Sequence, residues 1–258
     1  MAHPVFSCVI PVKGARQYFD DAVASLQSQG MGDSLEIIVQ DGDVETDMGQ
    51  SDALNKGFSK AKGEWFLWLN ADDVLLPGAL KKVLDRINRI DRIDWIAGNQ
   101  LLIDKDGKVQ KCSVGNGWHD WLYCHAVPHV YGPSSFFRRE LFEKVGGFET
   151  SLNYCMDWDL WIKFMKAGAR FERIGSYLWV QRQWNGSKTQ RKVPSEELAA
   201  HWDEIAGMLK KNQVDATRGG MLKMRLWRLV NGNVIRQCVD GWHYKGRKVS
   251  ELVRRGLI

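Results

Sequence analysis

The chain has 258 residues, of which 44% are hydrophobic and 26% are charged. This composition is that of a globular protein, and it excludes disordered and collagen-like chains. The net charge of +5 is modest, so we expect no nucleic-acid partner.

The first hundred residues alternate between strand and helix patterns. A short, nearly continuous apolar run at residues 5–12 is typical of a parallel strand that is buried on both faces. Strands separated by helices need crossover connections, so the sequence predicts an α/β fold with a doubly wound, mostly parallel, Rossmann-like sheet. Further strands are predicted at residues 35–39, 64–69 and 95–98, and helices at residues 18–29, 51–61 and 77–90.

The pattern changes after residue 99. Residues 101–104 and 109–112 flank a Gly-containing turn, which predicts a hairpin and therefore a small antiparallel portion of the sheet. Later patterns predict a strand at residues 135–137, a helix at 158–167, two strands within 171–183, and only helices beyond residue 192. We therefore predict a catalytic domain at 1–192, with a nucleotide-binding part at 1–99 and an acceptor-binding part at 100–192, followed by a C-terminal helical extension at 193–258.

Polar side chains follow the predicted strands, where ligands bind in sheets of this kind. The third strand is followed by Asn70, Ala71, Asp72 and Asp73. Adjacent carboxylates repel each other unless a cation neutralises them, and hard divalent ions bind carboxylate and phosphate oxygens. Asp72 and Asp73 are therefore candidate ligands for Mn²⁺ or Mg²⁺ against a diphosphate. The alternative is that one of them caps the next helix.

Two further carboxylates are candidates for chemistry. Asp157 lies near the start of a predicted helix, between aromatic residues. Burial there would raise the pKa of its carboxyl group, which suits a general base, whereas the helix N-terminus would favour its ionised form. Asp41 precedes Gly42 and could accept a hydrogen bond from the imide N–H of uracil. The alternatives are helix capping by Asp157 and an ordinary Asp-Gly turn at Asp41.

Other patterns exclude familiar sites. Residues 118–129 are rich in Trp, His and Cys, but their spacing matches no common zinc site, so we expect a lid or an acceptor loop there. No G-x-G-x-x-G follows the first strand, and there is no G-x-x-x-x-G-K-[ST] loop. Neither a nicotinamide-dependent enzyme nor a P-loop NTPase is therefore supported.

Together these features resemble the family 2 inverting glycosyltransferases, which have the GT-A fold. The resemblance covers roughly residues 4 to 190, and its stretches occur in the order of the family. Each stretch alone is weak evidence, but seven in order are specific. The matching stretches are Val9–Val12, Ile37–Gly42, Gly49–Gly57, Leu69–Asp73, Pro133–Arg139, Gly146–Phe148 and Asp157–Trp161.

The resemblance implies transfer of a sugar, with inversion, from a nucleoside diphosphate sugar to an acceptor hydroxyl. UDP is the favoured nucleotide, and the acceptor would be a glycan or a lipid-linked molecule in cell-surface polysaccharide or lipopolysaccharide biosynthesis. Asp157 would be the catalytic base, and Asp72 would hold Mn²⁺ or Mg²⁺ with Asp73 nearby. The resemblance places Pro11, Val12, Asp41, Asn55, Asn70, Asp72, Arg182 and Lys188 at the nucleotide sugar, and Trp158 and Ser135 at the acceptor.

Two positions depart from the family pattern. Asn70 stands where the family often has an aspartate, and an amide supplies no charge to a metal. Met156 stands before the proposed base, where an acidic residue is common, so Asp159 remains a rival of Asp157.

Two other classes of protein remain open. A sugar-1-phosphate nucleotidyltransferase would need a glycine-rich, basic loop after the first strand, and residues 12–16 match that only thinly. A non-catalytic sugar-binding protein of the same fold would not release nucleoside diphosphate from a donor.

The remaining features concern location. The five cysteines are scattered without a C-x-x-C pair, which favours a reducing compartment. Residues 1–10 lack the pattern of a signal peptide, and no apolar run approaches the roughly 20 residues that cross a bilayer, so we predict a cytoplasmic protein. Residues 221–230 are basic, apolar and Trp-containing. They predict peripheral contact of residues 217–236 with the inner face of the cytoplasmic membrane, or else a helix packed on the catalytic domain.

Overall fold

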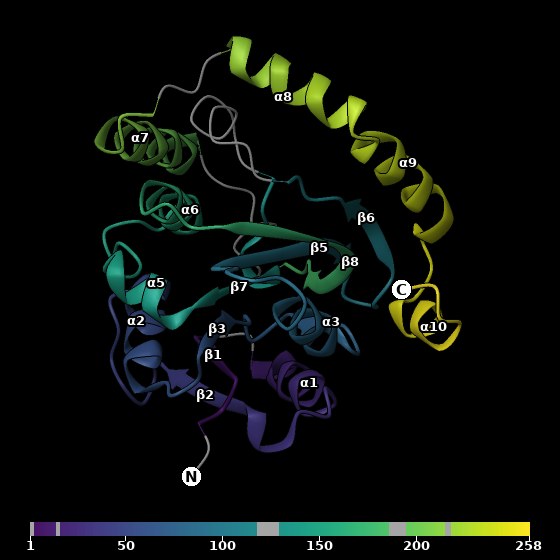
Figure 1. The fold of residues 1–258 in the computed structure, drawn as a ribbon, viewed down its shortest axis with the longest axis horizontal. Helices are drawn as coiled ribbons and strands as arrows, with labels where there is room; N and C mark the ends of the chain where they lie inside the picture. Colours follow the sequence, from purple (N-terminus) through teal and green to yellow (C-terminus); the bar gives the residue numbers. More distant parts are fainter. Residues whose placement is uncertain (1–2, 14–15, 118–128, 186–194, 215–217) are drawn as a thin grey trace.

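The computed structural model describes residues 3–13, 16–117, 129–185, 195–214 and 218–258. A mixed sheet lies at the centre, and helices cover both of its faces (Figure 1). Its strands follow the order β2-β1-β3-β7-β5-β8-β4, and β6 pairs with β5. The strands are β1 Phe6–Val12, β2 Leu35–Asp41, β3 Trp65–Trp68, β4 Val74–Leu75, β5 Trp95–Ile103, β6 Val109–Ser113, β7 Ser135–Arg138 and β8 Phe171–Arg182.

The predicted α/β fold is confirmed. The two longest pairings, β1 with β2 and β5 with β8, are parallel, and the antiparallel pairings involve β4, β6 and β7. Strand β7 lies between β3 and β5 and is antiparallel to both. Strands β1, β2, β3, β5 and β8 therefore run in the same direction, and their carboxyl ends share one edge of the sheet.

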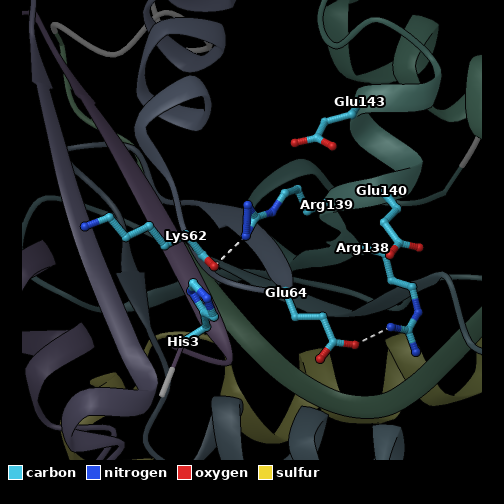
Figure 2. Close-up of a pocket in the computed structure, with 7 residues that line it drawn as sticks. All are labelled: His3, Lys62, Glu64, Arg138, Arg139, Glu140 and Glu143. Atoms are coloured by element: carbon cyan, nitrogen blue, oxygen red, sulfur yellow. Dashed lines mark hydrogen bonds and ion pairs between the residues drawn. The ribbon is translucent and has the colours of Figure 1, made fainter. Parts of the chain in front are cut away.

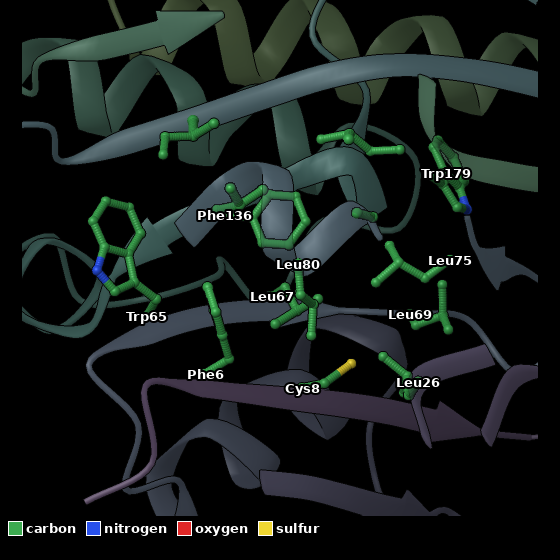
Figure 3. Close-up of a cluster of buried hydrophobic side chains, with 14 of the residues drawn as sticks. Phe6, Cys8, Leu26, Trp65, Leu67, Leu69, Leu75, Leu80, Phe136 and Trp179 are labelled. Carbon is green, nitrogen blue, oxygen red and sulfur yellow. The ribbon is translucent and has the colours of Figure 1, made fainter. Parts of the chain in front are cut away.

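Helices α2, α5 and α6 pack on one face of the sheet, and α1 and α3 pack on the other. The second face holds an apolar cluster in which Phe6 and Cys8 of β1 meet Leu26 of α1 and Leu80 of α3 (Figure 3). The helices are α1 Arg16–Gln27, α2 Gln50–Lys60, α3 Ala79–Ile87, α5 Arg139–Lys144, α6 Met156–Lys166, α7 Ser195–Lys211, α8 Arg218–Val230, α9 Asn233–Tyr244 and α10 Val249–Arg254.

Helix α2 lies close against β1 because its contact position is a glycine. A Cβ atom on Gly57 would lie 2.4 Å from Cγ1 of Val9, which no side chain could accommodate without a shift of the helix. This close approach brings the first turn of α2 to the carboxyl edge of the sheet, where it contacts the residues that follow β3.

The structure corrects two predicted boundaries. The strands predicted at residues 95–98 and 101–104 are one strand, β5, which ends at Ile103. It continues through Gly98, where the pairing with β8 shifts register. Residues 171–183, predicted as two strands, form the single strand β8. Strand β4 and helix α5 were not predicted, because two and six residues are too short to show a periodic pattern.

The C-terminal residues are helical, as predicted, and they share apolar clusters with the sheet domain. Met208 of α7 packs with Ile162 of α6, and Leu252 of α10 packs with Leu101 and Val109 of the β5–β6 pair. The predicted boundary at 192/193 lies outside the described residues. None of the helices in the described part of the chain has the length and hydropathy needed to cross a membrane.

Candidate active site

The segment after β3 is held by a chain of hydrogen bonds. Gln50 Nε2 donates to Asn70 Oδ1 over 2.9 Å, and Asn70 Nδ2 donates to Asp73 Oδ2 over 2.8 Å. The backbone N–H of Arg182 donates to Asp73 Oδ1 over 3.0 Å. Asp73 is 1% exposed, and burial, with the neighbouring charge of Asp72, raises its pKa well above the usual range. Asp73 therefore ties the end of β3 to the end of β8, and both of its oxygens are used within the protein.

Asp72 is the half-buried carboxylate of this pair, beside the residues that follow β8. Its Oδ2 accepts a hydrogen bond from Trp184 Nε1 at 2.9 Å, and its carbonyl accepts one from Arg182 Nε at 3.2 Å. The Arg182 guanidinium also pairs with Asp21 at 3.0 Å and lies over the ring of Tyr18, 4.4 Å from its centroid. Arg182 therefore lies at the predicted site, but its guanidinium contacts protein groups.

The ends of β1 and β2 form the neighbouring part of this edge. Pro11 and Val12 end β1, and Val12 pairs in register with Asp41 at the end of β2. Both carboxylate oxygens of Asp41 accept hydrogen bonds from Arg16 Nη2, at 2.9 and 2.8 Å. The backbone N–H of Asp43 and the Arg16 guanidinium lower the pKa of Asp41. Asp41 is therefore an ionised acceptor with a cation beside it.

Asp157 lies in the first turn of α6 and is half-buried. A Cβ atom on Gly132 would lie 2.6 Å from Cζ2 of Trp68, the last residue of β3, and 3.5 Å from Asp157 Oδ2. Asp157 is therefore close to the carboxyl end of β3.

The first turn of α2 joins the two candidate carboxylates. Gln50 donates to Asn70, two residues before Asp72, and the hydroxyl oxygen of Ser51 lies 3.1 Å from both the carbonyl oxygen of Leu152 and Met156 Sδ. Met156 immediately precedes Asp157. Consecutive residues of one helix thus hold the segments that carry Asp72 and Asp157 at the same edge of the sheet.

The rival Asp159 lies inside the protein. It is 1% exposed, its Oδ1 accepts a hydrogen bond from Asn212 at 2.8 Å, and its Oδ2 pairs with Lys163 at 2.8 Å. A carboxylate with these partners and this burial is out of reach of a substrate. Of the two acidic residues in α6, only Asp157 is placed where a substrate could contact it.

Two residues predicted to bind the acceptor are structural. Trp158 is 8% exposed and packs with Cys155 and Met208 between α6 and α7. Ser135 is fully buried, and its hydroxyl donates to the carbonyl of Tyr131 over 3.2 Å. A side chain enclosed by the core offers little surface to an acceptor, so the placement of these two residues gives no support to the predicted role.

Asn55, predicted to bind the nucleotide sugar, instead joins α2 to the turn before α6. Its Nδ2 donates to the carbonyl of Phe148 over 2.9 Å, and its Oδ1 accepts from the N–H of Phe148 at 3.0 Å. Gly147 has a φ of +70°, and a Cβ there would lie 2.7 Å from Asn55 Oδ1, so this turn requires glycine. The amide of Asn55 thus has a structural role.

We expect Asn55→Ala to lower the free energy of unfolding by about 1–3 kcal/mol, because it leaves the buried backbone groups of Phe148 without partners. Urea denaturation would measure this difference. Ser59→Ala is the matched control on the exposed face of α2, and it should change the stability by less than about 0.5 kcal/mol. Equal stabilities of the two variants would contradict the structural role of Asn55.

Two predicted features lie outside the described residues, namely Lys188 and most of the Trp- and His-rich segment. His129, at the end of that segment, is half-buried, and burial with the charge of Arg228 lowers its pKa to about 4. Its imidazole is therefore neutral at pH 7. Within the ranges that the structure describes, no three His, Cys, Asp or Glu side chains are grouped as a metal site would require.

Sequence reasoning missed Arg16, Gln50 and Trp184 as site residues. Gln50 lies inside a stretch that resembles the family, but nothing in its spacing indicates a bond to Asn70. Arg16 and Trp184 contact Asp41 and Asp72 only because α1 and the end of β8 meet at this edge. Such contacts are made by segments far apart in the chain, and no local pattern reveals them.

A cavity of about 450 Å³ lies at the opposite edge of the sheet (Figure 2). Glu64, just before β3, pairs there with Arg138, and Arg139 donates to the carbonyl of Lys62. Three of the charged side chains that line this cavity, those of Glu64, Arg138 and Arg139, are thus paired with each other or with the backbone. None of the predicted site residues lines this cavity, so we do not assign the activity to it.

The match to known proteins agrees with this geometry. The model of the family "Glycosyl transferase family 2" matches residues 44–146, which include the segment after β3. A glycosyltransferase of Rickettsia typhi is 26% identical over 247 residues, which cover 84% of this chain and 76% of the relative.

Solved structures show the same fold. TarS 1–349 of S. aureus in complex with UDP-GlcNAc superimposes with a TM-score of 0.60 at 17% identity, over 79% of this chain. The chain spans 65% of that TarS chain. A mannosyltransferase of Pyrobaculum calidifontis, in complex with GDP-Man and Mn²⁺, superimposes with a TM-score of 0.52 at 17% identity, over 82% of this chain and 63% of its own. The family match, the relative and the shared fold lead to one conclusion: the chain is similar to the family 2 glycosyltransferases and has a GT-A type fold.

Proposed function

We propose that the enzyme transfers a sugar, with inversion, from a nucleoside diphosphate sugar to a hydroxyl of a glycan or lipid-linked acceptor. UDP is the favoured nucleotide. The observation that supports this proposal is the placement of Asp72 and Asp157 at one edge of the sheet, held by consecutive residues of α2. The named complexes of the two solved relatives, with UDP-GlcNAc and with GDP-Man and Mn²⁺, support a nucleotide-sugar donor and a divalent ion.

The nucleotide would lie across the ends of β1 and β2. The backbone of Pro11 and Val12 would border the base, and Asp41 would accept a hydrogen bond from its imide N–H. Since Arg16 already occupies both oxygens of Asp41, the base would share this carboxylate with the guanidinium or displace it. Asn70 would contact the ribose through its half-buried amide. Since the amide oxygen accepts from Gln50 and the amide nitrogen donates to Asp73, a ribose hydroxyl would share one of these atoms or displace its partner.

Asp72 would hold Mn²⁺ or Mg²⁺, which would neutralise charge on the leaving diphosphate. Asp73 is the weaker of the two predicted ligands, because both of its oxygens accept hydrogen bonds within the protein. The guanidinium of Arg182 would assist the diphosphate after leaving Asp21. Lys188, which the resemblance assigns to the same task, is not described by the structure.

Asp157 would act as the base on the opposite side of the sugar. It would take the proton of the acceptor hydroxyl while the acceptor oxygen bonds to the anomeric carbon and the bond to the diphosphate oxygen breaks. The electron pair of that bond leaves with the diphosphate, so a single displacement inverts the configuration. An acceptor in cell-surface polysaccharide or lipopolysaccharide biosynthesis would suit a cytoplasmic enzyme. A lipid-linked acceptor would require the enzyme to work at a membrane surface. The predicted membrane contact of residues 217–236 would hold the enzyme there.

A thermal-shift screen tests this function. UDP, GDP, dTDP and CMP sugars are compared, each with and without Mn²⁺. A donor at 100 times its Kd stabilises the protein by about 2.7 kcal/mol, which raises the Tm of a chain of this size by several degrees. We expect the largest rise with a UDP-sugar and Mn²⁺, and release of UDP when an acceptor is supplied. A flat response to all four donors would contradict the proposal.

A further inference from the structure

The outer face of α8 and α9 carries exposed apolar side chains that do not pack against the rest of the described structure. Leu222, Leu226 and Leu229 on α8 are half or more exposed, at positions i, i+4 and i+7. The exposed large hydrophobic residues of α9, which are Ile235, Val239 and Trp242, have the same spacing. We call these six residues, together with Val230, the outer apolar stripe.

The stripe lies opposite the residues that attach the two helices to the domain. On α8, Met224 is buried, and Arg228 donates to the carbonyl of Val114 at 2.9 Å and to Asn116 Oδ1 at 2.8 Å. On α9, Asp240 accepts a hydrogen bond from the hydroxyl of Tyr177 at 2.6 Å. At 100° per residue these anchors are on the opposite side of each helix from the stripe.

Both helices are therefore attached to the domain by their other faces. In Figure 1 they form one continuous arc along the border of the molecule. Packing among the residues that the structure describes does not explain the stripe, and a surface of this kind marks an interaction.

The positive charge of residues 218–258 points to an anionic partner. Residues 218–258 contain ten Lys and Arg but only two Asp and Glu, a net charge of +8, whereas the whole chain carries +5 and residues 1–217 therefore carry −3. Exposed Lys223 and Arg225 lie on either side of the α8 part of the stripe. Trp242, 81% exposed, ends the stripe on α9. An apolar stripe bordered by basic side chains and carrying an exposed tryptophan is suited to the interface of an anionic bilayer.

We propose that the outer apolar stripe of α8 and α9 binds the surface of a membrane that contains anionic lipid. The helices lie in the plane of the interface, with the stripe among the acyl chains and the basic residues at the headgroups. The surface extends beyond residues 217–236 to the end of α9. It is separate from the residues proposed for catalysis, so it can be tested whether or not the proposed donor is correct.

The test is vesicle co-sedimentation of the full chain. Vesicles of phosphatidylcholine with about one third phosphatidylglycerol are compared with vesicles of phosphatidylcholine alone. We expect binding to the anionic vesicles that weakens at high salt, and weak binding to the neutral ones. Equal binding to both would overturn the proposal.

Matched variants locate the surface. Val230 and Val44 are both 84% exposed, but only Val230 belongs to the stripe. Combining Val230→Asp with Leu226→Asp should weaken binding to anionic vesicles by about tenfold or more, whereas Val44→Asp should leave it unchanged. Equal binding of both proteins would overturn the proposal.

Two controls complete the design. An unchanged circular dichroism spectrum and Tm of the stripe variant would show that it folds. Light scattering tests a second copy of the chain as the occupant. The proposal would be overturned if the wild-type chain formed a dimer, the stripe variant did not, and neither protein bound vesicles. The stripe would then be a surface for self-association. Donor-induced thermal shifts are measured without vesicles. A chain that does not bind vesicles can therefore be distinguished from a chain that does not bind the proposed donor.

Discussion

Replacement of Asp157 by Asn is expected to lower turnover by about 10²–10⁴-fold, the range for loss of a general base. The amide has nearly the same shape but cannot take the proton of the acceptor hydroxyl. Donor binding should survive, because the residues proposed to hold the nucleotide lie at the ends of β1, β2 and β3. The measurement is the steady-state rate of nucleoside diphosphate release with acceptor present, together with the donor-induced Tm shift.

Asp159→Asn is the matched control, two residues away on the same helix. It breaks a buried pair with Lys163, so it should lower the Tm while the folded enzyme keeps its turnover within a few-fold. A large loss of turnover in Asp159→Asn, together with nearly normal turnover in Asp157→Asn, would contradict the assignment of Asp157 as the base.

Replacement of Asp72 by Ala is expected to lower turnover by about 10²-fold or more, since a metal that stabilises the leaving diphosphate contributes several kcal/mol. The loss should not be restored by additional Mn²⁺ at moderate concentrations, and EDTA should inhibit the wild-type enzyme to a similar level. Titration of Mn²⁺ against the rate of nucleoside diphosphate release measures both effects.

A second variant, Asp73→Asn, tests whether Asp73 also binds the metal. Asp73→Asn replaces a buried carboxyl group whose pKa is raised, and it should keep at least one of the hydrogen bonds of that group. We therefore expect a change in stability with nearly unchanged Mn²⁺ dependence. A large rise in the Mn²⁺ concentration needed for half-maximal rate would make Asp73 a ligand. A normal rate for Asp72→Ala in EDTA would remove the metal from the mechanism.

Local patterns were sufficient for much of the fold. The run at residues 5–12 and the apolar segment at 64–69 became buried strands because they are apolar on both faces, and a strand covered by helices on both sides needs that pattern. The patterns failed at Gly98, where a glycine that normally ends a strand instead lies inside one. A register shift against β8 absorbs it, and that partner is about 75 residues further along the chain.

The candidate site was predicted only in part. The positions of Asp41 and Asp72 at strand ends follow from the chain order of strands and helices, as do those of Pro11 and Val12. Trp158 and Ser135 were assigned from stretches that resemble the family, but their burial depends on α7 and on the loop before β7. A motif specifies residue types and order, and it does not specify which side chains point into the core.

The sequence by itself determined the class of fold, the edge of the sheet at which we propose the site, and the acidic residues that follow β3 and begin α6. These features follow from hydrophobic periodicity and from side chains near each other in the chain. Only the tertiary structure distinguished Asp72 from Asp73 and Asp157 from Asp159, and turned the apolar stripe of α8 and α9 outward. Burial and hydrogen-bond partners decide such roles, and both depend on segments that meet only when the chain has folded.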